Sequence, residues 1–253
     1  MAHIVLAHGF LGFGSNPLNP GIHYFNGVAK ALRDQGHEIF EPTVDALGAL
    51  EHRSQQLASK INQHWPGTFD IAVIAHSMGG LDTRRILARD NTVGPRIRTL
   101  IAIATPHFGS PVADAMLDHT HALRASIPAP LLFALQNNDG ALEDLRTRTV
   151  LQDPDKPAGV RYMEVVCSAQ ENNDASPLFN LCRAIGKLSN AENDGVVTVQ
   201  SAKAPARTPI EIWPVDHGAA IGWPSSFGFD AFAALISPPQ DHIDRYISLA
   251  ARL

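Results

Sequence analysis

The chain contains a serine, an aspartate and a histidine that together could turn the serine hydroxyl into a nucleophile. Ser77 comes first, Asp194 follows, and His217 comes last. A serine hydroxyl is a weak nucleophile at neutral pH and needs a base within hydrogen-bond reach. A histidine can take and return the proton, and a carboxylate can orient the imidazole ring and stabilise its protonated form. The three residues are therefore candidates for a catalytic triad.

Ser77 lies between an expected strand and an expected helix. The apolar run 69–75 is rich in β-branched residues and stops at the sequence HSMGG, after which residues 81–89 show a helical spacing of apolar positions. A sharp strand-to-helix turn of this kind, a nucleophile elbow, lifts a serine off the end of a sheet. Ala75 and Gly79 supply the small neighbours that such a turn needs. The alternative is an ordinary strand-to-helix turn in a doubly wound sheet.

The acid and the base follow from their places in the chain. Asp194 comes after an expected strand and helix, and His217 comes directly after the last expected strand. Both would therefore lie on loops at the carboxyl edge of the sheet, as Ser77 does. Asp216 is adjacent to His217 and would have to fold back on it. A turn-forming aspartate before glycine and a solvated loop histidine are the simpler alternatives for Asp194 and His217. The other histidines fit less well as the base: His107, His119, His121 and His242.

A tetrahedral oxyanion needs N–H donors, and two backbone groups are candidates. Met78 follows the nucleophile, and Phe10 lies in the glycine-rich loop after the first strand. That loop has no phosphate-binding glycine pattern, but a plain glycine-rich turn is an alternative. Its large apolar residues favour an acyl-binding surface. The substrate-pocket candidates are Leu11, Phe13, His107 and Phe108.

Strands and helices alternate along most of the chain, which predicts an α/β fold with a mostly parallel sheet flanked by helices. The expected strands are 3–7, 37–40, 69–75, 97–104, 160–168 and 209–215. The expected helices are 24–35, 50–65, 81–89, 177–188, 227–236 and 241–253. Residues 111–158 contain helical stretches without a strand: 112–127, 129–136 and 140–151. We expect one domain, 1–253, in which 111–158 is a small helical cap or lid, or else a plain packing subdomain.

Composition excludes several functions and partners. The formal net charge of −5 and the scattered cations argue against nucleic acid or an anionic membrane as partner. Arg84, Arg85 and Arg89 are expected on one solvated helix face. No uninterrupted apolar run is long enough to span a bilayer, and the first residues lack a secretory leader. We therefore expect a cytoplasmic protein, or else a secreted one in its mature form. Cys167 and Cys182 lack metal-ligand spacing and are expected as buried free thiols rather than a disulfide.

Four segments together resemble the bacterial triacylglycerol lipases of the α/β-hydrolase superfamily. They are HGFLGF at 8–13, AHSMGGL at 75–81, TPHFGS at 105–110 and NDGVV at 193–197. The segment GALEDL at 140–145 also looks like part of the region that precedes the acid in that family. The likeness runs from the first strand to the last loop. It implies the α/β-hydrolase fold, with Ser77, Asp194 and His217 as triad and with Phe10 and Met78 as oxyanion hole.

The chain departs from that family in two respects. Many of those lipases bind a structural calcium ion through two aspartates. Asp174 matches the first aspartate, but Ala219 stands at the place of the second, so we expect no metal and no cofactor. Those lipases are also usually secreted, whereas this chain shows no leader, which favours an intracellular esterase or a hydrolase of a soluble substrate.

The sequence thus predicts a serine hydrolase that cleaves carboxylic esters through an acyl-enzyme intermediate. Its partner would be a small-molecule or lipid ester, with an acyl chain of medium or greater length. A thioesterase, amidase or acyltransferase would use the same triad, and a non-catalytic hydrolase-like binding protein is a further alternative. The sequence does not indicate the oligomeric state.

Overall fold

A computed structural model describes the greater part of the chain. The described residues are 1–12, 14, 23–118, 120, 125, 140–147, 159–169, 184–185, 191–203, 209–223 and 240–253. Several predictions lie outside them. These are the roles of Phe13, Asp174 and Cys182, the positions of His119 and His121, the helices 129–136 and 227–236, and most of the helix 177–188.

Six strands form one sheet in the order β2-β1-β3-β4-β5-β6. They are β1 (His3–Ala7), β2 (Glu38–Phe40), β3 (Ile71–His76), β4 (Ile97–Ile103), β5 (Arg161–Cys167) and β6 (Glu211–Trp213). All neighbouring pairs are parallel, which confirms the predicted parallel sheet. The strand expected from residue 69 begins two residues later. Phe69 is 58% exposed and Asp70 has a φ of 58°, so neither continues the extended backbone of β3.

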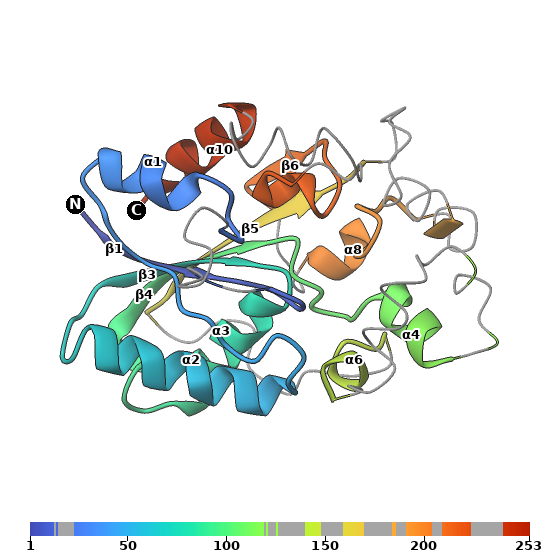
Figure 1. Ribbon diagram of the computed structural model, residues 1–253, viewed down its shortest axis with the longest axis horizontal. Coiled ribbons are helices and arrows are strands. Elements are labelled where there is room, and N and C mark those ends of the chain that lie inside the picture. The colour runs from blue at the N-terminus through green and yellow to red at the C-terminus, as the bar shows by residue number, and fades with distance from the viewer. Residues whose placement is uncertain are drawn as a thin grey trace.

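Helices cover both faces of the sheet (Figure 1). Helices α1 (Val28–Asp34) and α10 (Gln240–Ala250) pack on one face, and α2 (Leu50–His64) and α3 (Met78–Arg89) pack on the other. The alternation of side chains along a strand supplies both cores. Ile4 and Leu6 of β1 belong to the first core, whereas Val5 and Ala7 belong to the second. None of the described helices is long and apolar enough to cross a bilayer.

Three short helices lie beyond the carboxyl ends of the strands (Figure 1): α4 (Pro111–Leu117), α6 (Gly140–Asp144) and α8 (Val199–Ala202). Apolar residues of α4 and α6 pack against the first turn of α3. These two helices are the regular part of the predicted cap that the structure describes. Both are shorter than predicted, since the helices expected over 112–127 and 140–151 end at Leu117 and Asp144. After α6, the carbonyl of Leu145 accepts a hydrogen bond from the N–H of Ser110, 2.7 Å away.

One side chain that we expected in solvent is buried. Arg84 is 3% exposed and donates to Nδ1 of His107, 2.8 Å away. Arg85 instead binds Glu51 at 2.8 Å, and half of the Arg89 side chain is exposed. Positions 85 and 89 are one helical turn apart and share a face, whereas position 84 is rotated by about 100° toward the protein interior. The prediction of a single solvated arginine face was therefore wrong for Arg84.

Cys167, the last residue of β5, is a free and buried cysteine. The prediction of a buried free thiol is therefore confirmed for Cys167, the one cysteine that the structure describes.

Candidate active site

Ser77 occupies the sharp turn between β3 and α3. Its backbone has φ 54° and ψ −128°, an unusual conformation for a residue with a side chain. The turn is held on both sides, because the N–H of Ser77 donates to Ile103 at 2.9 Å and its carbonyl accepts from Gly80 at 3.0 Å. The strand, the strained residue and the helix have the geometry expected of a nucleophile elbow.

The elbow needs glycine where other backbone passes close to it. A Cβ on Gly79 would lie 2.4 Å from the carbonyl oxygen of Ala7, so only glycine lets α3 begin against the end of β1. A Cβ on Gly9 would lie 2.8 Å from the Cβ of Ser77. The loop after β1 therefore passes directly over the serine, where its backbone can face the reacting atoms. We call residues 8–12 the oxyanion loop.

Asp194 and His217 meet from two loops at the same edge of the sheet. Nδ1 of His217 donates to Oδ2 of Asp194 at 2.7 Å, and the backbone N–H of His217 donates to the Asp194 carbonyl at 2.9 Å. The other carboxylate oxygen, Oδ1, accepts the N–H groups of Val196 and Val197 at 2.9 and 2.7 Å. The carboxylate is 1% exposed and the imidazole 13%. The acid is thus rigidly held, and it orients the ring of His217.

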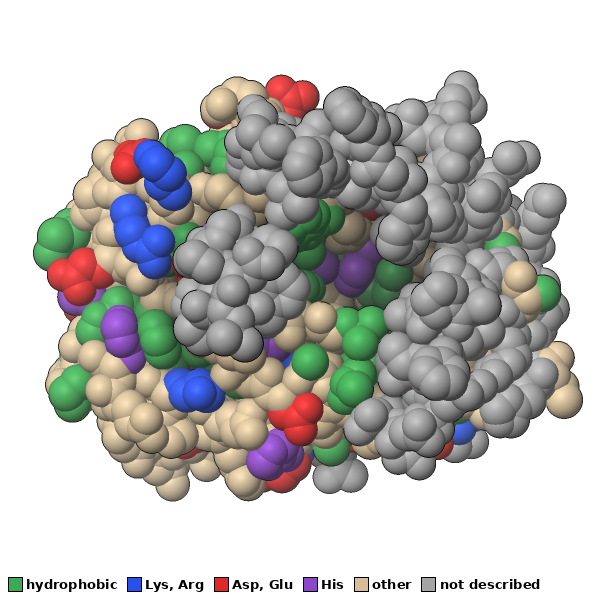
Figure 2. Space-filling model, in the orientation of Figure 1, with side chains coloured by type: hydrophobic (Ala, Val, Ile, Leu, Met, Phe, Trp, Pro, Cys, Tyr) green, Lys and Arg blue, Asp and Glu red, His purple; other side chains and the backbone are tan. Residues whose placement is uncertain are grey.

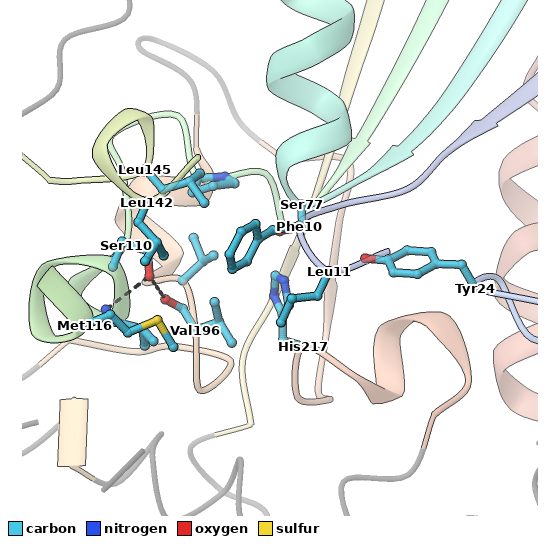
Figure 3. Close-up of a pocket in the computed structure, with 14 residues that line it drawn as sticks. Phe10, Leu11, Tyr24, Ser77, Ser110, Met116, Leu142, Leu145, Val196 and His217 are labelled. Carbon is cyan, nitrogen blue, oxygen red and sulfur yellow. Dashed lines mark hydrogen bonds between the residues drawn. The ribbon is translucent and has the colours of Figure 1, made fainter. Parts of the chain in front are cut away.

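Ser77 and His217 line one cavity at the carboxyl edge of the sheet. The close-up in Figure 3 shows the His217 ring beside Ser77, with Phe10 next to both. Seen from outside, histidine side chains lie among hydrophobic ones in a recess on this face (Figure 2). The cavity encloses about 710 Å³, part of it open to solvent. The structure therefore brings the predicted serine, histidine and aspartate together, and it also places Phe10 and Leu11 at the cavity.

The cavity wall beyond Ser77 is apolar. Helices α4 and α6 and the loop that carries Asp194 supply it, with Val112, Met116, Leu142, Leu145 and Val196 among the lining residues. Met116, Leu142, Leu145 and Val196 lie on one side of Ser77 and His217, and Tyr24 lies on the other side (Figure 3). The polar reacting groups therefore open onto a space that suits a hydrocarbon chain.

Two predicted pocket residues are not part of the cavity lining. His107 is buried, with Nε2 3.3 Å from Glu164 and 3.1 Å from the hydroxyl of Tyr162. The guanidinium of Arg84 donates to Nδ1, which turns the ring away from the cavity. Phe108 is 46% exposed. Both residues follow β4, which is why we predicted them in the substrate pocket. In the structure, however, His107 is bound by buried polar side chains outside that pocket. We therefore leave both residues out of the substrate site.

The described residues contain no group of three or more histidine, cysteine, aspartate or glutamate side chains that could hold a metal ion. Ala219, which stands at the place of the second calcium ligand, donates its N–H to Asp216 at 2.8 Å. Asp174 lies outside the described residues.

Comparison with known proteins finds similar sequences and similar folds. A family model described as the PGAP1-like alpha/beta domain matches residues 47–131. Triacylglycerol lipase 2 of Saccharomyces cerevisiae is 27% identical over 217 residues, which cover 80% of this chain and 63% of the yeast protein. A triacylglycerol lipase of Pseudomonas fragi is 32% identical over 119 residues, covering 45% and 37% of the two chains. The chain thus spans less than two thirds of the length of either relative.

Among solved structures, a metagenomic carboxyl esterase superposes on 98% of this chain and 74% of its own, with a TM-score of 0.73 at 20% identity. The chain has the α/β-hydrolase fold, and it is similar in sequence to triacylglycerol lipases. The fold expected from the sequence is confirmed. Similar proteins occur in a yeast as well as in a bacterium, so the likeness is not confined to bacterial lipases.

A buried arginine supports the oxyanion loop. Arg53 of α2 is fully buried and binds Asp82 of α3 through two nitrogens, at 3.0 and 2.7 Å. The same guanidinium donates to the carbonyl of Asp45 at 2.6 Å and to those of His8 and Gly9 at 3.0 and 3.4 Å. Its planar set of donors thereby joins two helices to the loop that passes over Ser77.

His8 holds the same loop from inside. Its Nε2 accepts the N–H of Val44 at 2.9 Å, and Nδ1 donates to the carbonyl of Gly9 at 2.9 Å. Burial and the charge of Arg53 lower the pKa of His8 to about 4, so its ring is neutral at pH 7. Each ring nitrogen therefore has a defined role in shaping the loop.

Arg53→Met is expected to destabilise the protein and to lower the kcat of any reaction at this site. The substitution leaves the Asp82 carboxylate buried without a partner, which costs about 3–5 kcal/mol. Thermal unfolding measures this loss. In the double variant Arg53→Met/Asp82→Leu the buried charge is gone, so stability should largely return. The carbonyls of His8 and Gly9 still lack their donor, so kcat should stay low. Full recovery of kcat together with stability would contradict a role for Arg53 in the oxyanion loop.

One feature of the sequence could have predicted that Arg53 is buried. Arg53 lies between Leu50 and Leu57 on the buried stripe of α2, three and four residues from them, where a charged side chain points into the protein. The ring of His76, at the end of β3, lies 4.4 Å from that of His217, in the loop after β6. The sequence held no signal for this contact, because the two residues lie far apart along the chain.

Proposed function

We propose that this α/β-hydrolase cleaves carboxylic esters through a triad of Ser77, His217 and Asp194. The observation that carries the proposal is the 2.7 Å hydrogen bond between His217 and Asp194, made beside a serine with elbow geometry at the mouth of an apolar cavity. An ester substrate also accords with the lipase and esterase names of its relatives.

The reaction proceeds in two halves. In the first, Oγ of Ser77 attacks the ester carbonyl carbon while Nε2 of His217 takes the hydroxyl proton. Asp194 holds the imidazole so that Nε2 faces the serine, and it stabilises the imidazolium. His217 then gives the proton to the leaving alcohol, and an acyl-enzyme remains on Ser77. In the second half, His217 activates a water molecule, which releases the acid and regenerates Ser77.

The developing oxyanion is stabilised by the backbone N–H groups of Met78 and Phe10. Met78 is the first residue of α3, so its N–H lies at the positive end of the helix dipole. Phe10 belongs to the oxyanion loop, which Arg53 and His8 hold in place. Each such donor contributes about 10²–10³ to the rate.

The acyl chain extends from Ser77 toward α4 and α6. Replacing Met116 with alanine enlarges this end of the cavity and is expected to move the preference toward longer acyl chains. Each additional buried methylene is worth about 0.8 kcal/mol, or roughly fourfold in kcat/KM. A series of p-nitrophenyl esters from acetate to palmitate measures the change. Met163→Ala is the matched control, since Met163 of β5 is also buried but packs in the core between the sheet and helices α1 and α10. Equal profiles for the two variants would contradict this placement of the chain.

Covalent labelling tests the function itself. A fluorophosphonate should modify the wild-type protein in a time-dependent way, and peptide mass spectrometry should find the adduct on Ser77. Parallel assays with p-nitrophenyl esters, acyl-CoA and an acyl amide identify the bond that is cleaved. Failure to label Ser77 would refute the proposed nucleophile. A higher kcat/KM for acyl-CoA or for the amide would retain the triad but assign a thioesterase or an amidase.

A further inference from the structure

A second histidine lies directly against the proposed catalytic base. His76 is the last residue of β3, immediately before Ser77, and it is 1% exposed. Its ring centroid lies 4.4 Å from that of His217, with the two planes tilted by 49°. Such a separation is within the range of packed aromatic pairs. The mechanism above gives His76 no part in the chemistry.

Tyr24 fixes the other side of the His76 ring. The hydroxyl of Tyr24 lies 2.8 Å from Nδ1 of His76. Burial raises the pKa of the Tyr24 phenol, and hydrogen bonding from the backbone of Gly9 opposes this. The phenol is therefore neutral at pH 7, with its oxygen next to the oxyanion loop. A continuous line of contacts thus runs from Gly9 through Tyr24 and His76 to His217.

The His76 ring is neutral at the pH at which the hydrolase would work. Burial lowers the pKa of His76 well below its ordinary value, the charge of His217 lowers it further, and hydrogen bonding to the backbone of His217 raises it. A neutral imidazole can remain against His217 when that residue takes a proton, because no like charge is brought together.

The hydrogen bond to Asp194 fixes the His217 ring at one atom only. A ring held at Nδ1 can still swing about that point, which would move Nε2 relative to Ser77. A misplacement of the order of 1 Å in a reacting group can cost about 10²-fold in rate. A further contact restrains the ring, and His76 supplies one, with its centroid 4.4 Å from that of His217 and the two planes tilted by 49°.

We propose that His76 is a positioning residue, which Tyr24 holds in place and whose ring fixes the orientation of His217 for proton transfer. This inference rests on the proposed function. It predicts that the ring of residue 76, rather than its nitrogen atoms, supports catalysis.

Two variants separate the ring from its hydrogen bond. His76→Asn keeps an amide that can bind the Tyr24 hydroxyl but removes the ring. The double variant Tyr24→Phe/His76→Phe keeps two rings and removes both partners of the Tyr24–His76 hydrogen bond together, so neither of these side chains is left without the other. For His76→Asn, kcat should fall by about 3- to 10-fold, with KM changed less than about twofold. In the double variant, kcat should return to within about twofold of the wild type.

Controls distinguish positioning from general stability. Ile4→Val removes a buried methylene from β1, beside Ala72 and four residues before His76 along β3, which costs about 0.5–1.5 kcal/mol. It should lower Tm without changing kcat. An unchanged kcat in His76→Asn would overturn the proposal. So would a double variant as slow as His76→Asn, because the hydrogen bond rather than the ring would then be responsible.

A spectroscopic measurement separates this inference from the proposed function. The proton shared by His217 Nδ1 and Asp194 should give a low-field NMR resonance that broadens in His76→Asn and stays sharp in the double variant. This readout needs no substrate. If Ser77 fails to label, the proposed function fails, and the resonance still tests whether His76 orders His217. An equally sharp resonance in all three proteins would refute the positioning role.

Discussion

Ser77→Ala is expected to lower ester hydrolysis by about 10⁶-fold while the fold persists. The substitution removes the only atom that can form the acyl-enzyme in the proposed reaction, and losses of about that size follow removal of a nucleophilic serine from a triad. Alanine keeps the Cβ and hence the strain of the positive φ at this position, so the thermal stability of the variant should match that of the wild type. Single-turnover kinetics and thermal unfolding measure both quantities.

Ser77→Gly is the matched companion of that experiment. Glycine adopts a positive φ without the clash that a Cβ causes, a difference of about 1–2 kcal/mol. The glycine variant should therefore be as inactive as Ser77→Ala but more stable than the wild type. A glycine variant no more stable than the alanine variant would show that the elbow is not strained. Substantial hydrolysis by either variant would exclude Ser77 as the nucleophile.

Asp194→Asn is expected to lower kcat by about 10⁴-fold with the structure of the loop intact. Oδ1 accepts two backbone N–H groups, from Val196 and Val197. The carbonyl oxygen of the new amide must take that place, so its NH₂ group must face Nδ1 of His217. A donor at this position favours the tautomer with the proton on Nε2, and that nitrogen can then no longer accept the proton of Ser77.

Asp216→Asn is the control for the acid. Asp216 is adjacent to His217 in sequence, and its Oδ1 accepts the N–H of Ala219 at 2.8 Å, which an amide oxygen can also accept. The kcat of the Asp216→Asn variant should therefore stay within about tenfold of the wild-type value. If Asp216→Asn were the slower of the two variants, the assignment of Asp194 as the acid would be wrong.

Local sequence signals were enough to predict the sheet and the elbow. Runs of β-branched residues gave β3 and β4 to within two residues, because a strand buried on both faces has to be apolar throughout. The small residues around Ser77 indicated the elbow, because the close approach of the Ala7 carbonyl excludes a side chain on Gly79. The order of Ser77, Asp194 and His217 could be read because each follows a strand at one edge of a parallel sheet.

Side chains with charges were harder to place, because their positions depend on partners that are far away in the sequence. Arg84 has a solvated sequence context, but His107 binds it inside the protein. The sequence predicted His107 in the substrate pocket because it follows β4, but its ring instead contacts Glu164 and Tyr162.

By itself, the sequence determined the fold class, the elbow and the chain order of the three candidate catalytic residues, because these depend on apolar periodicity and on the size of close neighbours. Only the tertiary structure decided that Arg53 supports the oxyanion loop and that His76 packs against His217. The physical reason is that a buried polar group must find its partner in three dimensions, and separation along the chain does not specify that partner.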